Sequence, residues 1–228
     1  MQELEKLLQK LGIKFSDRNV LQKAFIHRSY LNEIKGELES NERLEFLGDS
    51  ILSFIISSYL YTKRPKDPEG MLTNLRSYIV KTKSLAEAAG NLKLGEYLKL
   101  SKGEDISGGR NNPQLLANTY EALIGAIYLD QGLEKTEDFI METLIPFFTK
   151  EVESGPPKDA KSFLQELVQE EQKQSPQYKI VKTFGPDHAK QFVIGVFIKG
   201  DKVGQGQGTS KQEAEEKAAS EALGTLSK

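Results

Sequence analysis

The sequence predicts an all-α domain over residues 1–153, a linker over 154–158 and a small α+β domain over 159–227. Apolar residues recur at helical spacing through most of the first region, which is typical of amphipathic helices. Glycine and proline crowd the linker. Runs of β-branched and aromatic residues then replace the helical pattern, and these indicate strands. With 228 residues, the chain is long enough for two such domains.

The expected helices of the first domain end where glycine or proline interrupts the apolar pattern. Leucines at helical spacing over 4–11 predict the first helix, which Gly12 ends. The segment 107–113, rich in glycine and asparagine, indicates a loop. By the same criteria, further helices are expected over 20–30, 42–61, 71–89, 114–130 and 134–153.

The second domain is expected to have the order α-β-β-β-α. A helix is predicted over 160–172, with Phe163, Leu164, Leu167 and Val168 as its apolar side. Strands are predicted over 178–183 and 192–198, with a short third strand over 202–206. Ser210 suits the N-cap of a last helix through Leu223. The small residues Ala214, Ala218, Ala219 and Ala222 would form the packing face of this helix.

The composition excludes several classes of protein. The chain has no cysteine, so disulfides and thiolate metal sites are excluded, in agreement with a reducing, cytoplasmic location. The N-terminus has no signal-peptide pattern, and no apolar run is long enough for a membrane span. The net charge is −2, so any affinity for nucleic acid must come from the placement of individual charges.

One predicted helix carries carboxylates on a single face. At about 100° per residue, Glu42, Glu45 and Asp49 fall within roughly 60° of one another. Like charges on neighbouring turns repel, so this face needs a cation, and a hard divalent ion prefers oxygen ligands. The opposite side is expected to be core and consists of Leu44, Leu47, Ile51, Phe54 and Ile55.

A second predicted helix places Asn118 and Glu121 on one face, together with the small residues Ala122, Gly125 and Ala126. Small residues allow a close approach to another helix, and the two helices together could build a metal site of four oxygen ligands. Its ligands would be Glu45, Asp49, Asn118 and Glu121. The alternative is that both faces are simply solvated, as most acidic helix faces are.

These segments resemble the ribonuclease III family. The stretch Asn41-Glu42-Arg43-Leu44-Glu45-Phe46-Leu47-Gly48-Asp49 resembles its signature, and 116–130 resembles its second acidic helix. Ala24-Phe25-Ile26-His27-Arg28-Ser29-Tyr30 and the segments Ser101-Lys102-Gly103-Glu104 and Ser107-Gly108-Gly109-Arg110 also look like family segments, in family order. Residues 158–226 resemble a double-stranded-RNA-binding domain.

The resemblance implies a homodimeric endonuclease that hydrolyses double-stranded RNA, such as rRNA and mRNA precursors, with Mg²⁺ or Mn²⁺. The products would carry 5′-phosphate and 3′-hydroxyl ends. Asp49 and Glu121 match the catalytic acids, Glu45 matches a metal ligand, and Glu42 matches an accessory acid. The resemblance places Phe46 at the dimer interface, although burial under a neighbouring loop would also explain an aromatic residue on this face.

One position departs from the family pattern, since Asn118 stands where an aspartate is usual. An amide oxygen can bind Mg²⁺ but brings no charge, so we expect a higher Mg²⁺ requirement that Asn118→Asp relieves. The alternative is a double-stranded-RNA-binding or ribosome-associated protein that cuts weakly or not at all. A metal-dependent phosphohydrolase of nucleotides is a third reading, which the RNA-binding-like tail disfavours.

The second domain contains the expected RNA contacts. Neutral side chains on its first helix suit the shallow minor groove of A-form RNA, and the start of its last helix suits phosphate. Gln212 replaces a lysine common in the family, for which Lys217 could compensate. His27 and Arg28 are interpreted as structural, and the Ser-Gly-Gly-Arg segment as a phosphate loop or a plain turn. The expected RNA-binding residues are Ser162, Gln165, Gln169, Pro186, His188, Ser210, Lys211 and Lys217.

Overall fold

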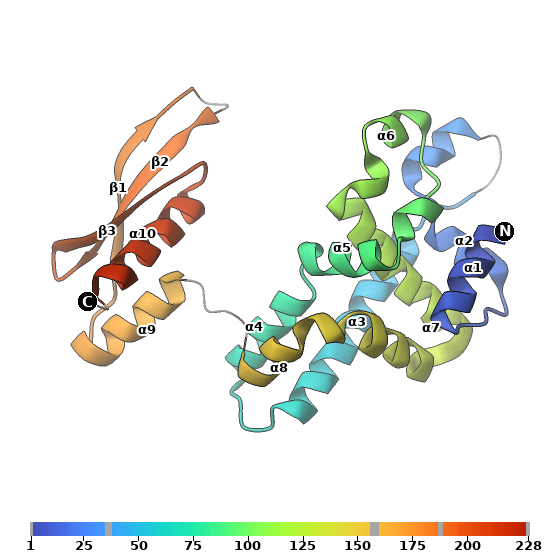
Figure 1. Cartoon of the computed structure of the whole chain (residues 1–228), viewed down its shortest axis with the longest axis horizontal. Helices are drawn as coiled ribbons and strands as arrows, with labels where there is room; N and C mark the ends of the chain where they lie inside the picture. Colours follow the sequence, from blue (N-terminus) through green and yellow to red (C-terminus); the bar gives the residue numbers. More distant parts are fainter. Residues whose placement is uncertain (1, 35–37, 156–159, 187–188, 227–228) are drawn as a thin grey trace. The chain divides into compact units, whose positions relative to one another are not determined.

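The computed structural model describes residues 2–34, 38–155, 160–186 and 189–226. The chain forms two compact units, Met1–Pro156 and Pro157–Lys228, each of which has its own core (Figure 1). The division falls within the predicted linker 154–158, of which 156–158 lie outside the described residues. Among the described residues, no helix combines the length and apolar character that a membrane crossing needs.

The first unit is helical, as predicted, and its core lies around α3 and α7. Leu52, Ile56 and Leu60 of α3 pack with Leu123 and Ile124 of α7, and all are fully buried. The α-helices are α1 (Gln2–Leu11), α2 (Arg18–Ala24), α3 (Glu42–Lys63), α4 (Glu69–Ile79), α5 (Thr82–Asn91), α6 (Lys102–Ile106), α7 (Pro113–Thr143) and α8 (Thr149–Ser154). Short 3₁₀ helices are η1 (Arg28–Glu33), η2 (Leu94–Tyr97), η3 (Gly109–Asn111) and η4 (Ile145–Phe148).

Three predicted helices of this unit have the wrong extent. The helix expected over 20–30 ends at Ala24, because Ile26 forms a parallel bridge with Lys99 instead. The helix expected over 71–89 is two helices, separated where Lys81 adopts an extended conformation. The helix expected over 134–153 ends at Thr143, before Pro146, whereas the break expected between 130 and 134 is present as a kink at Gly132, whose φ of 79° is not helical. Proline lacks the N–H that would continue the helix.

The second unit confirms the predicted order α-β-β-β-α. Its elements are α9 (Ala160–Gln172), β1 (Gln177–Phe184), β2 (Gln191–Ile198), β3 (Asp201–Gly208) and α10 (Lys211–Leu226). The strands form an antiparallel sheet of order β1-β2-β3. Ser210 Oγ accepts from the Glu213 N–H, as expected for an N-cap, and the four alanines of the α10 packing face are fully buried. Phe163, expected on the apolar side of α9, is 46% exposed.

Candidate active site

Helices α3 and α7 touch backbone to backbone at two glycines. A Cβ added to Gly48 would overlap the carbonyl oxygen of Glu121, and one added to Gly125 would overlap the carbonyl oxygen of Leu44. Only glycine allows this approach. Because Gly48 lies between Glu45 and Asp49, the contact brings the acidic face of α3 against the Asn118–Glu121 face of α7. The predicted close approach of the small-residue face is therefore confirmed.

The carboxyl groups at this crossing are crowded. Burial, followed by the nearby charges of Asp49 and Glu45, raises the pKa of Glu121 to about 7. Burial and the charges of Glu42 and Asp49 also raise the pKa of Glu45, against the lowering effect of a hydrogen bond with Asn118. A carboxyl whose ionised form is this disfavoured gains from a nearby cation. The exposed Glu42 lies at the edge, where it accepts from Ser40 Oγ at 2.8 Å.

A divalent cation fits the chemistry of this donor set. The side chains of Glu45, Asp49, Glu121 and Asn118 offer only oxygen ligands, which Mg²⁺ prefers, and its charge would offset their mutual repulsion. In the part of the chain that the structure describes, no three His, Asp or Glu side chains are already gathered as ligands of a metal ion. The residues therefore suit a cation, but their oxygens would have to converge on it.

Asn118 presents its amide group in an orientation opposite to that of a metal ligand. Its Oδ1 accepts from Gln114 Nε2 at 2.7 Å, and its side chain also hydrogen-bonds to Glu45. Because a carboxylate only accepts, the amide NH₂ is the group that faces Glu45. The oxygen could reach a cation beside Glu45 only after the amide turns over. Sequence reasoning missed Gln114, although its i, i+4 spacing from Asn118 was a usable signal.

A pocket of about 390 Å³ opens beside this crossing. Glu42, Glu45 and Asn118 line it, whereas Asp49 and Glu121 do not. His27 and Arg28, which sequence reasoning treated as structural, line it as well. The pocket therefore joins half of the predicted acidic site to a pair of basic residues.

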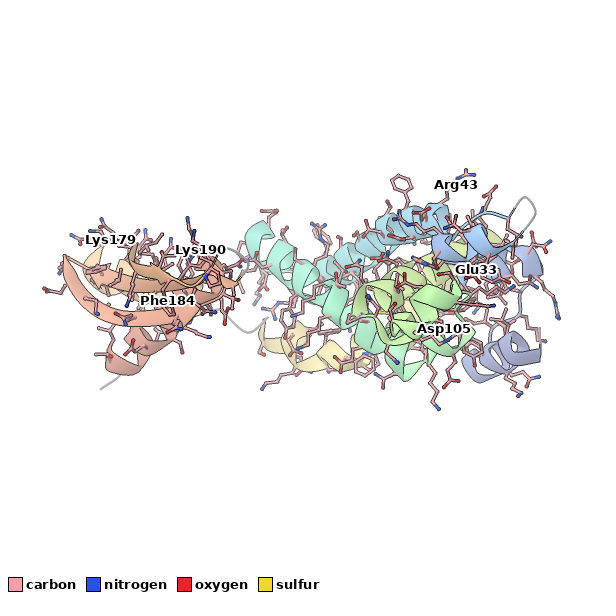
Figure 2. The ribbon with its side chains drawn as sticks, turned by 90° about the horizontal axis from the view of Figure 1, so that it is seen from above. Glu33, Arg43, Asp105, Lys179, Phe184 and Lys190 are labelled. Atoms are coloured by element: carbon pink, nitrogen blue, oxygen red, sulfur yellow. The ribbon has the colours of Figure 1, made fainter. Side chains whose placement is uncertain are left out.

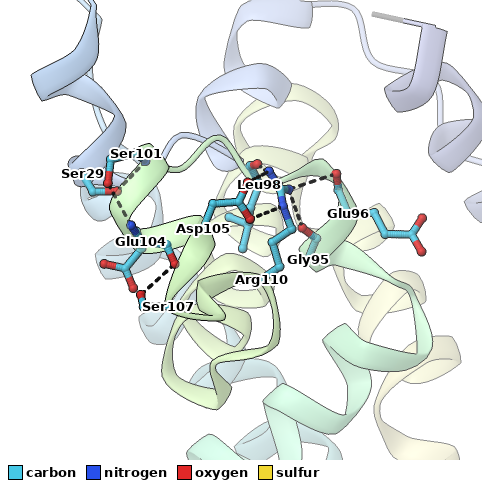
Figure 3. Close-up of polar contacts among 9 residues, drawn as sticks. All are labelled: Ser29, Gly95, Glu96, Leu98, Ser101, Glu104, Asp105, Ser107 and Arg110. Carbon is cyan, nitrogen blue, oxygen red and sulfur yellow. Dashed lines mark hydrogen bonds and ion pairs between the residues drawn. The ribbon is translucent and has the colours of Figure 1, made fainter.

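The Ser-Gly-Gly-Arg segment serves the fold. Gly108 adopts a left-handed φ of 87° and makes the turn. Arg110 donates from Nη1 to the carbonyl oxygens of Gly95 and Leu98 at 3.0 and 2.8 Å, and it forms a bidentate ion pair with Asp105 (Figure 3). Its guanidinium is thus directed at the protein and connects this segment to the carbonyl groups around η2. The same contacts hold Leu98, which lines the pocket.

Phe46 belongs to an exposed apolar stripe on α3. Its side chain is 78% exposed, so no loop among the described residues buries it. Phe54, expected in the core, is 58% exposed, and Tyr61 is 75% exposed. At about 100° per residue these three side chains share one face of the helix, which lies next to the acidic face. Phe54 was wrongly assigned because it lies at the border between this stripe and the core.

The second unit brings some of its predicted RNA-binding residues together. Ser162 and Gln165 of α9 and Ser210 at the start of α10 line one groove of about 820 Å³. Gln169, Pro186 and Lys211 are exposed outside it, and His188 lies outside the described residues. The compensation expected from Lys217 is opposed by its ion pair with Glu213 at 2.7 Å. This hydrogen bond, with two from Thr209, lowers the pKa of Glu213 to about 2.

Comparisons with known proteins agree with this architecture. Residues 17–147 match the family model described as ribonuclease-III-like, and 160–226 match the double-stranded RNA binding motif. The protein named Ribonuclease 3 of Pelotomaculum thermopropionicum is 46% identical over 97% of this chain and 92% of its own length. That of Streptococcus sanguinis is 46% identical over 98% of this chain and 97% of its own.

A solved structure matches the first unit. It is the nuclease domain of ribonuclease III from Campylobacter jejuni, described as flexible in a region involved in dimer formation. It is 38% identical to this chain with a TM-score of 0.60, and the match covers 64% of this chain and 99% of that domain.

Proposed function

Because the chain belongs to the ribonuclease III family, we propose that it hydrolyses double-stranded RNA with Mg²⁺ bound between α3 and α7, and that Mn²⁺ can replace Mg²⁺. The chain is an endoribonuclease of double-stranded RNA. The proposal adds the cation, 5′-phosphate and 3′-hydroxyl product ends, and rRNA and mRNA precursors as cytoplasmic substrates. The observation that carries it is the glycine contact that sets the acids of α3 against Glu121 in a chain with a double-stranded-RNA-binding unit.

The residues at the crossing of α3 and α7 are assigned different roles in the proposed reaction. A bound Mg²⁺ would activate water, stabilise charge on the phosphate and assist the leaving 3′ oxygen. Glu45, Asn118 and Glu121 would hold it, and Asp49 would complete the centre or orient the water. Since Glu121 retains its proton up to about pH 7 in the metal-free protein, binding of a cation must displace that proton.

A cleavage assay on a long RNA duplex tests the proposal. We expect cleavage with Mg²⁺, none with EDTA, and none of a single strand of the same sequence. The Asn118 NH₂ that faces Glu45 is the observation behind the alternative, a protein that binds the duplex but cuts it poorly. Duplex binding without cleavage at any Mg²⁺ concentration would establish that alternative.

Replacing Asn118 with aspartate is expected to lower the Mg²⁺ concentration for half-maximal cleavage by about tenfold, which corresponds to about 1.4 kcal/mol. The new carboxylate faces the cation without turning over. Without metal, the aspartate at position 118 cannot donate a hydrogen bond to Glu45 and its charge repels that of Glu45. The free energy of unfolding should therefore fall by about 1 kcal/mol. A Mg²⁺ titration of the cleavage rate measures the first effect, and thermal unfolding in EDTA measures the second.

The matched control for Asn118→Asp is Asn112→Asp. Asn112 caps the same helix, its Oδ1 accepting from the Gln114 N–H at 2.9 Å, and aspartate caps a helix equally well. It adds the same charge outside the site. An equal change in Mg²⁺ dependence for both variants would show a general charge effect and contradict the role given to Asn118.

We also propose that the α3 stripe pairs two subunits. Phe46→Glu is expected to shift the protein from dimer to monomer in sedimentation velocity, because it puts a charge into an apolar contact. Ile106→Glu is the control, since Ile106 is 87% exposed on α6, away from the stripe. A Phe46→Glu protein that stays dimeric would exclude Phe46 from the interface.

A further inference from the structure

The pocket beside the acidic crossing has a wall that the proposed metal chemistry does not use. His27 and Arg28 line it, and Glu45 and Asn118 line it as well. At ~30 Å³ per water molecule, about 390 Å³ holds roughly a dozen waters, enough for a phosphate with its ribose. A pocket lined by carboxylates and by the guanidinium of Arg28 suits neither a bare anion nor a second cation alone.

His27 is held in place by Ser29. Its Nδ1 accepts from the Ser29 N–H at 3.3 Å and lies 2.8 Å from Ser29 Oγ. Burial lowers the pKa of His27, which favours the neutral ring. With Nδ1 accepting, the proton of a neutral ring lies on Nε2. His27, which lines the pocket, therefore has Nε2 as an uncharged hydrogen-bond donor.

Arg28 is only loosely engaged. Its side chain is 73% exposed, and its Nη1 lies 3.7 Å from Glu42 Oε1, longer than a hydrogen bond. An exposed pair of this kind contributes little to stability, so exchanging Glu42 for another anion costs little. A guanidinium matches the geometry of a phosphate with two parallel donors. Arg28 is thus suited to move from Glu42 to a phosphate that enters the pocket.

We propose that Arg28 and His27 form a subsite for a backbone phosphate of the RNA strand next to the phosphate that is cleaved. The subsite rests on the proposed function, because a strand reaches it only if its neighbouring phosphate lies at the acidic crossing. Glu42 and Glu45 repel a phosphate while no cation is present, so the subsite fills after the metal site. Arg28 supplies charge, and His27 supplies a neutral hydrogen bond.

The test is the salt dependence of kcat/KM for cleavage of a short duplex by the full chain. Loss of one phosphate contact should make the slope of log kcat/KM against log salt shallower by ~0.9. Arg28→Ala should show this change and lose about tenfold in kcat/KM at low salt, whereas Arg28→Lys should retain the slope. His27→Ala should lower kcat/KM without changing the slope, because no charge is removed.

Arg43→Ala is the matched control. Arg43 is a neighbouring arginine that is 84% exposed, lies 3.8 Å from Glu39 and does not line the pocket. Figure 2 shows its side chain pointing away from the helical unit. The Arg43→Ala substitution removes one positive charge near the pocket without changing its lining. The slope of log kcat/KM against log salt should therefore equal that of the wild type. Equal slopes for the Arg28→Ala and Arg43→Ala proteins would overturn the subsite.

Two further measurements separate the possible failures. The Mg²⁺ affinity, measured by calorimetry without RNA, should be the same in the Arg28→Ala and wild-type proteins. A weaker affinity in the Arg28→Ala protein would show that Arg28 helps to position the acidic residues, and it would overturn the subsite. A single uncharged methylphosphonate beside the scissile phosphate should slow the wild type but not the Arg28→Ala protein. If the wild type does not cleave the duplex, the proposed function fails, whereas an unchanged slope in a cleaving Arg28→Ala protein overturns only the subsite.

Discussion

Replacing Glu121 with glutamine is expected to abolish cleavage and, at the same time, to stabilise the metal-free protein at pH 8. Glutamine keeps the size of the side chain but removes the charge that would hold the cation, so we expect a loss of at least ~10³-fold in kcat, on the order of 4 kcal/mol. Duplex binding by the second unit should persist, because its groove lies on α9 and α10.

The stabilisation follows from the raised pKa of Glu121. Burial, followed by the charges of Asp49 and Glu45, brings this pKa from 4.5 to about 7 in the folded protein. Between these values the folded state holds a proton that the unfolded state has lost, so the free energy of unfolding falls as pH rises through this window. After allowance for solvent screening, the loss at pH 8 is about 2 kcal/mol. Glutamine does not ionise, so the Glu121→Gln protein does not lose this stability at pH 8.

Urea unfolding in EDTA at pH 8 and pH 4 measures this effect. The Glu121→Gln protein should exceed the wild type by about 2 kcal/mol at pH 8, with a difference near zero at pH 4. Glu137→Gln is the control, since Glu137 is an exposed acid on the same helix. Cleavage by Glu121→Gln at ordinary Mg²⁺ would refute the role of Glu121, and equal stability at pH 8 would refute the crowding of the acids.

The sequence could predict which acidic side chains share a helix face, because helical periodicity determines this. Glu45 and Asp49 on α3, and Asn118 and Glu121 on α7, each follow from spacing within one helix. The close approach at Gly48 was harder to predict from the sequence, because a single glycine in a helix adds nothing to the periodic apolar pattern. Contacts between distant segments had no signal at all, so the bridge of Ile26 with Lys99 cut short a predicted helix.

The same limit explains the residues that were misplaced. Phe54 and Phe163 are apolar residues at the border of a core face, where spacing alone cannot decide between burial and exposure. The orientation of the Asn118 amide depends on Gln114 and Glu45 together, which lie on two helices. His27 and Arg28 reach the pocket because the Asn41 N–H, at the start of α3, donates to the Ile26 carbonyl oxygen at 2.8 Å. Each miss concerns a tertiary contact rather than a local preference.

Gly48→Ala is expected to be the most damaging small substitution in the helical unit. In an isolated helix, alanine would be favoured over glycine by about 1 kcal/mol. Here the new methyl group would overlap the backbone oxygen of Glu121, which cannot move aside as a side chain could. The two helices must separate, at a cost of roughly 3 kcal/mol or more in the free energy of unfolding.

Separation of the helices should also remove cleavage, because the close approach at Gly48 sets Glu45 and Asp49 of α3 against Glu121 of α7. Gly90→Ala is the control: it lies on α5, and nothing lies within 4 Å of its added Cβ, so the substitution should be neutral or stabilise the protein. Urea unfolding and Mg²⁺-dependent cleavage measure both effects. A Gly48→Ala protein that is destabilised yet keeps its cleavage rate at low temperature would show that the acids tolerate separation. The close approach of α3 and α7 would then support the fold but not the chemistry.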